Sequence, residues 1–248
     1  MALGERHLAW DGCLNVRDLG GHPTEDGGET RFGSIVRADS VRQLSEEGWA
    51  ELTGYGVSLI VDLRMHAERA EDPAEETPVE VVHLPFFVED DAIFREVDAA
   101  SLAAPDLATA TRDVYLIFLE RCRENVAAAI KAVADAPEGA VVVHCAGGKD
   151  RTGLVTAFLL KIAGVSDEHI ADDYAISEER LKPRHDRWLA EAETEAERAR
   201  LRRILVTPAE SMLAVLRELE RRYGSIDGYL KAGGLSDEDL ARVRARLR

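Results

Sequence analysis

The stretch AVVVHCAGGKDRTGLVTAFLLKIAG, from Ala140 to Gly164, changes its residue pattern twice. It begins with the apolar run Ala140–Val143, whose valines are typical of a strand buried on both faces. A turn with two glycines follows, and Thr152–Gly164 then has the apolar spacing of a helix. A strand, a tight turn and a helix in succession form the unit from which parallel α/β sheets are built.

Three further apolar runs, at Ser34–Asp39, Val57–Leu63 and Val79–Pro85, also predict strands. Helical patterns lie between the strands, and the longest of them runs from Thr111 to Ala134. After Gly164 the strand patterns stop, so residues of about 165–248 are predicted to be helical. We therefore expect an α/β fold with a mostly parallel central sheet flanked by helices and a helical C-terminal third.

Two stretches have less regular patterns. Val88–Ala110 is acidic and alanine-rich and follows the end of a predicted strand, so we expect a lid or a mobile loop there. Ala190–Arg203 is so densely charged that it predicts a solvated helix face.

Composition places the chain among folded globular proteins. Its 248 residues and 46% hydrophobic content suffice for a sizeable core, and we expect residues 1–248 to form a single domain. The formal net charge of −16 disfavours nucleic acid as a partner, because an acidic surface repels phosphate backbones. For the same reason we expect no stable membrane association.

The chain contains three cysteines, Cys13, Cys122 and Cys145. Their number and spacing suit neither a disulfide framework nor a zinc site. The first residues lack an apolar run of signal-peptide length, and no stretch approaches the about 18 apolar residues of a membrane span. These features predict a cytoplasmic protein, and export without a signal peptide would also be compatible with them.

The backbone of the central turn is suited to bind an anion. Gly147 and Gly148 let the chain curl so that its amides converge, and the following helix adds unpaired N–H groups and a partial positive charge. Ligands of parallel sheets bind beyond the carboxyl ends of the strands, where this turn lies. The predicted substrate-binding residues are Ala146, Gly147, Gly148, Lys149, Thr152 and Gly153.

The side chains of the same turn supply reactive groups. A thiol such as that of Cys145 ionises more readily at a helix N-terminus beside a cation and is then a nucleophile. Arg151 offers a planar fork that can bind two phosphoryl oxygens, and Thr152 can donate a hydrogen bond to the thiolate. Lys149 adds a second cation at the rim, and Asp150 places a carboxyl group beside the leaving group.

Two other interpretations of this turn are weaker. A nucleotide-binding P-loop requires Ser or Thr after its Gly-Lys pair and a further glycine upstream, but Asp150 and Val143 occupy those positions. A buried structural cysteine is the common role of a lone Cys, but it leaves the surrounding glycines and Arg151 unexplained.

His144-Cys145, five residues and then Arg151-Thr152 resemble the signature of the cysteine-dependent tyrosine and dual-specificity phosphatases. The loop and NVRDLGG (Asn15–Gly21) are similar to the bacterial branch that includes phosphoinositide-active members, although Val16 replaces the usual Phe. Further segments match that branch in the same order, and the resemblance covers nearly the whole chain. These further segments are VDLR (Val61–Arg64), HLPF (His83–Phe86), ADDYAIS (Ala171–Ser177) and YGSIDGYL (Tyr223–Leu230).

The resemblance implies a two-step reaction without metal or cofactor. Cys145 would attack phosphorus and form a cysteinyl-phosphate while a carboxylic acid protonates the leaving oxygen. Water would then hydrolyse the intermediate, with Arg151 and the loop amides holding the phosphoryl oxygens. The implied substrate is phosphotyrosine in a protein, with phosphoserine, phosphothreonine and phosphoinositides as further candidates.

The general acid departs from the family pattern. Many relatives have an Asp soon after the HLPF-like strand, but Val88 stands near that position, followed by Glu89, Asp90 and Asp91. We expect Asp150 to be the acid, with Asp90 as the alternative.

Other residues are expected to support the site. His144 would order the loop through hydrogen bonds, and Arg17 and Asp18 would brace it. Asp62 and Arg64 leave a strand at the same sheet edge, and they fit either an ordering role or a purely structural ion pair. For the two remaining cysteines, Cys122 is expected in the core and Cys13 is expected to be inert, with a disulfide to Cys145 as the alternative.

Two other classes of function remain as alternatives. One is a phosphate-binding module without catalysis, which the intact Cys145 and Arg151 disfavour. The other is a different thiol enzyme, such as a sulfurtransferase or an arsenate reductase. It is disfavoured because no second cysteine lies near Cys145 in the sequence.

Overall fold

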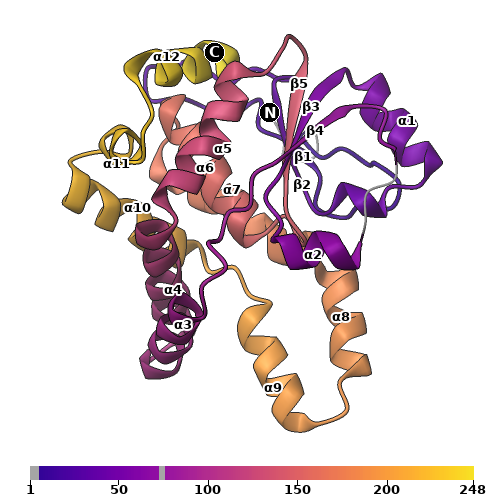
Figure 1. Cartoon of the computed structure of the whole chain (residues 1–248), viewed down its shortest axis with the longest axis vertical. Coiled ribbons are helices and arrows are strands. Elements are labelled where there is room, and N and C mark those ends of the chain that lie inside the picture. The colour runs from indigo at the N-terminus through magenta and orange to yellow at the C-terminus, as the bar shows by residue number, and fades with distance from the viewer. Residues whose placement is uncertain (1–5, 73–75) are drawn as a thin grey trace.

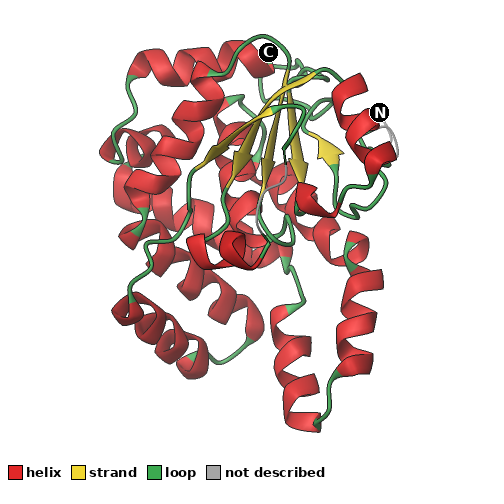
Figure 2. Ribbon diagram, turned by 45° about the vertical axis from the view of Figure 1, so that its right-hand side comes forward, coloured by secondary structure: helices red, strands yellow, loops and turns green. Residues whose placement is uncertain are grey.

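The computed structural model describes residues 6–72 and 76–248, so Met1–Glu5 of the predicted domain and residues 73–75 lie outside it. A five-stranded sheet with the order β1-β2-β5-β3-β4 forms the centre (Figure 2). The strands are β1 (Arg17–Asp18), β2 (Ile35–Ala38), β3 (Val57–Asp62), β4 (Glu80–His83) and β5 (Ala140–His144). All neighbours pair in parallel except β1, which pairs with β2 antiparallel at the edge. The predicted α/β class with a mostly parallel sheet is confirmed.

The sheet is buried on both faces, as its continuous apolar strands predict. Alternate residues of β5 show this, because Val141 and Val143 belong to the larger core cluster and Val142 to the smaller one. The helices are α1 (Glu46–Gly54), α2 (His66–Glu71), α3 (Asp91–Ala103), α4 (Leu107–Arg121), α5 (Arg123–Asp135), α6 (Asp150–Ile162), α7 (Asp167–Arg180), α8 (Lys182–Glu191), α9 (Glu195–Ile204), α10 (Ala209–Tyr223), α11 (Ile226–Ala232) and α12 (Asp237–Leu247). Helix α1 lies on one side of the sheet and α5 and α6 lie on the other (Figure 1).

Helices form all of the regular structure after β5, which confirms the helical C-terminal third. Within residues 6–72 and 76–248, no helix combines the length and the apolarity needed to cross a membrane.

Three predicted elements were wrong in detail. The long helix expected over Thr111–Ala134 is divided into α4 and α5 at Cys122, whose buried thiol accepts a hydrogen bond from the backbone N of Val88. The expected lid or mobile loop contains α3, with Asp90 as its N-cap. The solvated helix face expected over Ala190–Arg203 is mostly exposed, but it belongs to two helices, α8 and α9, because the chain leaves the helix after Glu191 and Thr194 caps α9.

Candidate active site

The loop between β5 and α6 connects the centre of the sheet to the N-terminus of a buried helix. Gly148 has a φ of 63°, and a Cβ there would lie 2.4 Å from the carbonyl oxygen of Ala38 at the end of β2. A side chain at this position would therefore meet both backbone strain and a steric clash. Gly153 in the first turn of α6 allows Tyr174 of α7 to pack closely, since a Cβ would lie 3.0 Å from its ring.

Hydrogen bonds hold the carbonyl groups of this loop from outside. The backbone N of Ser40 donates to the carbonyl of Ala146 at 3.1 Å, and Asn15 Nδ2 donates to those of Gly147 and Gly148 at 3.1 and 3.0 Å. Arg37 also donates to the carbonyl of Gly148, at 2.8 Å. Because the C=O and N–H groups of a planar trans peptide point in opposite directions, the amides that follow these carbonyls face the concave side of the loop.

A buried ion-pair network connects this bracing to α7. Asp173 of α7 accepts from Arg37 Nη1 at 2.6 Å and from Arg17 Nε at 3.3 Å, and all three side chains are buried. Burial favours the neutral form of Asp173, but the two guanidinium groups outweigh it and hold its pKa far below the usual range. Burial also lowers the pKa of Arg17 to about 10, against the opposing effect of Asp173.

Arg151 projects from the first turn of α6 and is held from two sides. Glu68 of α2 accepts from both of its terminal nitrogens, from Nη2 at 2.8 Å. The guanidinium carbon lies 5.3 Å from the centre of the Phe87 ring, within range of a cation–π contact. Burial alone would lower the pKa of Arg151, but Cys145 and Glu68 raise it above its usual value. The fork is therefore fixed in orientation and permanently charged beside the thiol.

Cys145 and its neighbours lie at the base of the loop, and the thiol side chain is buried. Thr152 is fully buried, and its Oγ1 has no hydrogen-bond partner within the described part of the chain. A buried hydroxyl without a partner is unfavourable. The structure shows no hydrogen bond from this hydroxyl to the Cys145 sulfur, so the predicted donation to a thiolate stays a prediction. His144 Nδ1 lies 3.2 Å from the carbonyl oxygen of Cys145, and its Nε2 lies 3.7 Å from Asp62.

Asp150 lies next to Arg151 in a cavity of about 260 Å³. Its other lining residues are Phe87, Val114, Tyr115, Phe118 and Leu154. The hydroxyl of Tyr115 donates to the Asp150 carboxylate and lies 2.8 Å from that of Tyr174. An aromatic lining that also includes a carboxylate and a guanidinium suits a flat substrate group that carries an anion.

Lys149 takes a different position from the one expected. Its side chain is largely buried, and Nζ donates to the backbone carbonyl of Ile204 at the end of α9. The ammonium group also lies 3.5 Å from Asp150. It therefore connects the loop to the end of α9, whereas the sequence predicted a cation at the rim.

The remaining supporting residues divide into two groups. Arg64 binds Asp62 at 3.0 Å, and Asp62 lies 3.7 Å from Nε2 of His144, so this pair lies next to the residue that precedes Cys145. Burial alone would raise the pKa of Asp62, but His144 and Arg64 lower it. Asp18 does not reach the loop, because its carboxylate accepts from Gly20 N at 2.5 Å, from Gly33 N at 2.8 Å and from Tyr55. The expectation that Asp18 braces the loop directly was therefore wrong.

The acids after β4 lie at the start of α3. Asp90 Oδ1 accepts from the backbone N of Ala92 at 2.7 Å, and Glu89 accepts from the backbone N of His66 at 2.7 Å. Both carboxylates therefore have local structural partners. Neither Glu89 nor Asp90 lines the cavity that contains Asp150 and Arg151.

All three cysteines are free. Cys122 is buried in the core as expected. Cys13 donates to the carbonyl of Ser40 at 3.4 Å, and burial together with nearby Asp39 raises its pKa far above that of a reactive thiol.

Comparison with known proteins agrees with this arrangement. A family model described as "Tyrosine phosphatase family" matches residues 8–248. The chain belongs to this family. It is 29% identical to the triple specificity protein phosphatase PtpB of Mycobacterium tuberculosis over an alignment of 282 residues, which covers 100% of this chain and 99% of PtpB. It is 27% identical to a tyrosine-protein phosphatase of Nostoc commune over 229 residues, which cover 86% and 74% of the two chains. The protein is therefore a protein-tyrosine phosphatase.

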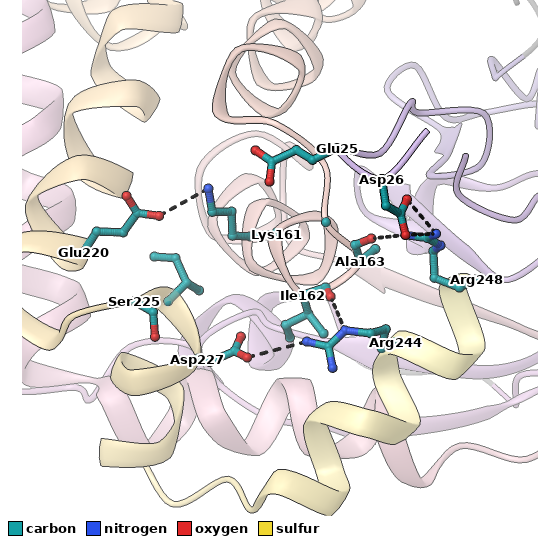
Figure 3. Close-up of a pocket in the computed structure, with 12 residues that line it drawn as sticks. Glu25, Asp26, Lys161, Ile162, Ala163, Glu220, Ser225, Asp227, Arg244 and Arg248 are labelled. Atoms are coloured by element: carbon teal, nitrogen blue, oxygen red, sulfur yellow. Dashed lines mark hydrogen bonds and ion pairs between the residues drawn. The ribbon is translucent and has the colours of Figure 1, made fainter. Parts of the chain in front are cut away.

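A second polar cavity of this phosphatase lies at the other end of α6 (Figure 3). It has a volume of about 410 Å³, and most of its charged groups bind one another or the backbone. Arg248 binds Asp26 at 2.7 Å, and Lys161 binds Glu220 at 3.2 Å. Arg244 and Arg248 also donate to the carbonyls of Ile162 and Ala163, at 2.9 Å each. These arginines cap the C-terminus of the helix that carries Arg151 at its other end.

The sequence interpretation of this phosphatase missed four residues around the loop: Arg37, Glu68, Tyr115 and Asp173. Arg37 gave the clearest signal, because a charged residue inside the buried strand IVRA requires a buried partner. Asp173 and Tyr174 lay in the quoted segment ADDYAIS without a role. No local pattern indicates Glu68 or Tyr115, since each meets its loop partner only in the folded chain.

Proposed function

We propose that the protein hydrolyses phosphotyrosine through a cysteinyl-phosphate on Cys145. The observation that carries this proposal is the placement of Asp150 and Arg151 in one aromatic-walled cavity beside the Cys145 loop. The similarity to PtpB, a triple specificity protein phosphatase, supports a substrate range wider than phosphotyrosine. Phosphoserine, phosphothreonine and phosphoinositides are the further candidates, as the family resemblance implies.

In the first step, the Cys145 thiolate attacks phosphorus, and the bond from phosphorus to the tyrosine oxygen breaks. Asp150 gives its proton to that oxygen, so tyrosine leaves as a neutral phenol. In the second step, water attacks the phosphorus while Asp150 takes a proton from it, and the bond from phosphorus to sulfur breaks. Inorganic phosphate leaves and the thiolate is restored.

The loop amides and Arg151 stabilise the charge on the phosphoryl oxygens during both steps. The outward hydrogen bonds of Asn15 and Arg37 fix the loop, so its N–H groups need little rearrangement when the substrate binds. Glu68 and Phe87 fix the fork of Arg151 in the same way.

Turnover of phosphotyrosine should continue in EDTA and stop with vanadate or peroxide. The proposed steps contain no metal, vanadate resembles five-coordinate phosphorus, and an ionised thiol oxidises readily. Phosphate release from a panel of phosphopeptides and soluble phosphoinositides measures this. A strict requirement for an added divalent metal would contradict the proposed mechanism.

Asp150→Asn should slow hydrolysis of phosphotyrosine by about 10²–10⁴-fold, the usual contribution of a positioned general acid. p-Nitrophenyl phosphate should be affected less, because its leaving group needs little protonation. Steady-state kinetics with both substrates give the comparison. Asp90→Asn is the matched control, because it removes the carboxylate that caps α3. A leaving-group effect in Asp90→Asn but not in Asp150→Asn would place the acid after β4.

A further inference from the structure

A groove of about 760 Å³ leads away from the loop between two projecting helical hairpins. Helices α3 and α4 form one wall and α9 forms the other, and both hairpins project from the same end of the molecule (Figure 1). Lys149 and Asp150 lie at its inner end. The groove shares Val114, Tyr115 and Asp150 with the cavity beside Arg151, so the two spaces adjoin.

Both walls of the groove expose apolar side chains. Leu102 at the end of α3 is 85% exposed, and Ile204 at the end of α9 is 52% exposed. Val97, Leu107, Val114 and Val206 add apolar surface, while Asp98, Ser101 and Thr111 place polar groups among them. A surface that mixes apolar and polar groups suits a peptide, whose side chains and backbone are themselves mixed, better than an acyl chain.

The arginines of α9 differ according to the side that they face. Arg198 and Arg202 each bind Glu195, at 3.1 and 2.7 Å. Arg200 and Arg203 line the groove instead, and neither has an acidic partner among the described residues. Their spacing of three residues places them on one side of the helix. Two unpaired cations on a chain of net charge −16 provide an attractive site for an anionic group.

We propose that this groove binds the segment next to the phosphorylated residue of a protein substrate. Acidic side chains of that segment contact Arg200 and Arg203, and an aliphatic or aromatic side chain packs between Leu102 and Ile204. The inference rests on the proposed function, because it requires the phosphorylated residue to occupy the Cys145 loop. It predicts a preference for acidic, apolar sequence around the phosphotyrosine.

Four substrates test the proposal: free phosphotyrosine, a soluble phosphoinositide, a phosphotyrosine peptide with flanking Glu and Leu, and the same peptide with Lys in place of Glu. Wild-type kcat/KM should be highest for the acidic peptide. In the double variant Arg200→Ala/Arg203→Ala, kcat/KM for the acidic peptide should fall by about fivefold, because two exposed ion pairs with the peptide are lost. The same double variant should hydrolyse free phosphotyrosine at the wild-type rate, because this substrate has no flanking segment. Arg187→Ala/Arg202→Ala is the control, because it removes the same charge from positions outside the groove.

The outcomes separate this proposal from the proposed function. Failure of the wild type to hydrolyse free phosphotyrosine would contradict the proposed function itself. Normal hydrolysis of phosphotyrosine, with equal kcat/KM for the acidic and lysine peptides, would overturn the groove alone. Equal losses in the two double variants would also overturn it, because they would indicate a general charge effect. A loss confined to a soluble phosphoinositide would assign the arginines to a lipid headgroup instead.

Discussion

Cys145→Ser should lose turnover of phosphotyrosine by about 10⁴-fold or more while it still binds phosphate or vanadate. A serine hydroxyl has nearly the same size, but it is not ionised beside Arg151 and is a far weaker nucleophile than a thiolate. Replacement of an enzyme nucleophile commonly causes losses of this order or larger. The loop amides and Arg151 remain, so the site for the anion is preserved. Steady-state kinetics and calorimetric titration with vanadate measure the two properties.

Cys122→Ser is the matched control, because Cys122 is also a free buried cysteine but lies between α4 and α5. It should change stability without a comparable loss of kcat. Turnover near the wild-type rate in Cys145→Ser would contradict the assignment of the nucleophile. An equal loss in both variants would indicate damage to the fold.

Arg151→Lys should lower kcat by about 10³-fold although it retains a positive charge. Contacts of arginine with a transferring phosphoryl group contribute 10³–10⁵-fold in comparable reactions. Lysine offers a point charge, whereas the planar fork can bind two phosphoryl oxygens while Glu68 and Phe87 fix its plane. Single-turnover kinetics separate this loss in the chemical step from a change in substrate binding.

Arg121→Lys is the control for this substitution, because Arg121 forms an exposed ion pair with Glu96 away from the loop. It should retain wild-type kinetics. If Arg151→Lys lost less than tenfold in the chemical step, the bidentate grip on the phosphoryl group would be excluded as a main source of rate.

The centre of the fold could be predicted because its information is local. The segment Ala140–Gly164 contains strand, loop and helix signals within one stretch, and the structure has β5, the loop and α6 there. The strands β2, β3 and β4 were likewise predictable from short apolar runs. Their order in the sheet is a tertiary property that these runs do not specify.

Helix α3 shows how a local signal can be misinterpreted. The capping Asp90, the alanines and the apolar residues Ile93, Phe94 and Val97 all favour a helix, but the acidic composition suggested a loop. The break at Cys122 is a different case. No glycine or proline marks it, and the tertiary contact of Cys122 with Val88 accompanies it.

The bracing of the loop could be predicted only in part. Asn15 and Arg17 belonged to a motif that suggested a role, whereas the partners Glu68–Arg151 and Arg37–Asp173 are 83 and 136 residues apart. A single sequence contains no information on which of many acids meets which arginine. The groove between α3–α4 and α9 was equally hidden, because it depends on where two hairpins lie relative to the loop.

The covalent step is the central claim, and rapid-quench labelling tests it most directly. The enzyme would be mixed with substrate that carries radioactive phosphorus, quenched within milliseconds and digested, and the labelled peptide would be sequenced. The account predicts a transient label on Cys145 that decays as phosphate is released and is absent from Cys145→Ser. A label on another residue, or full turnover with no labelled enzyme at any time, would contradict it.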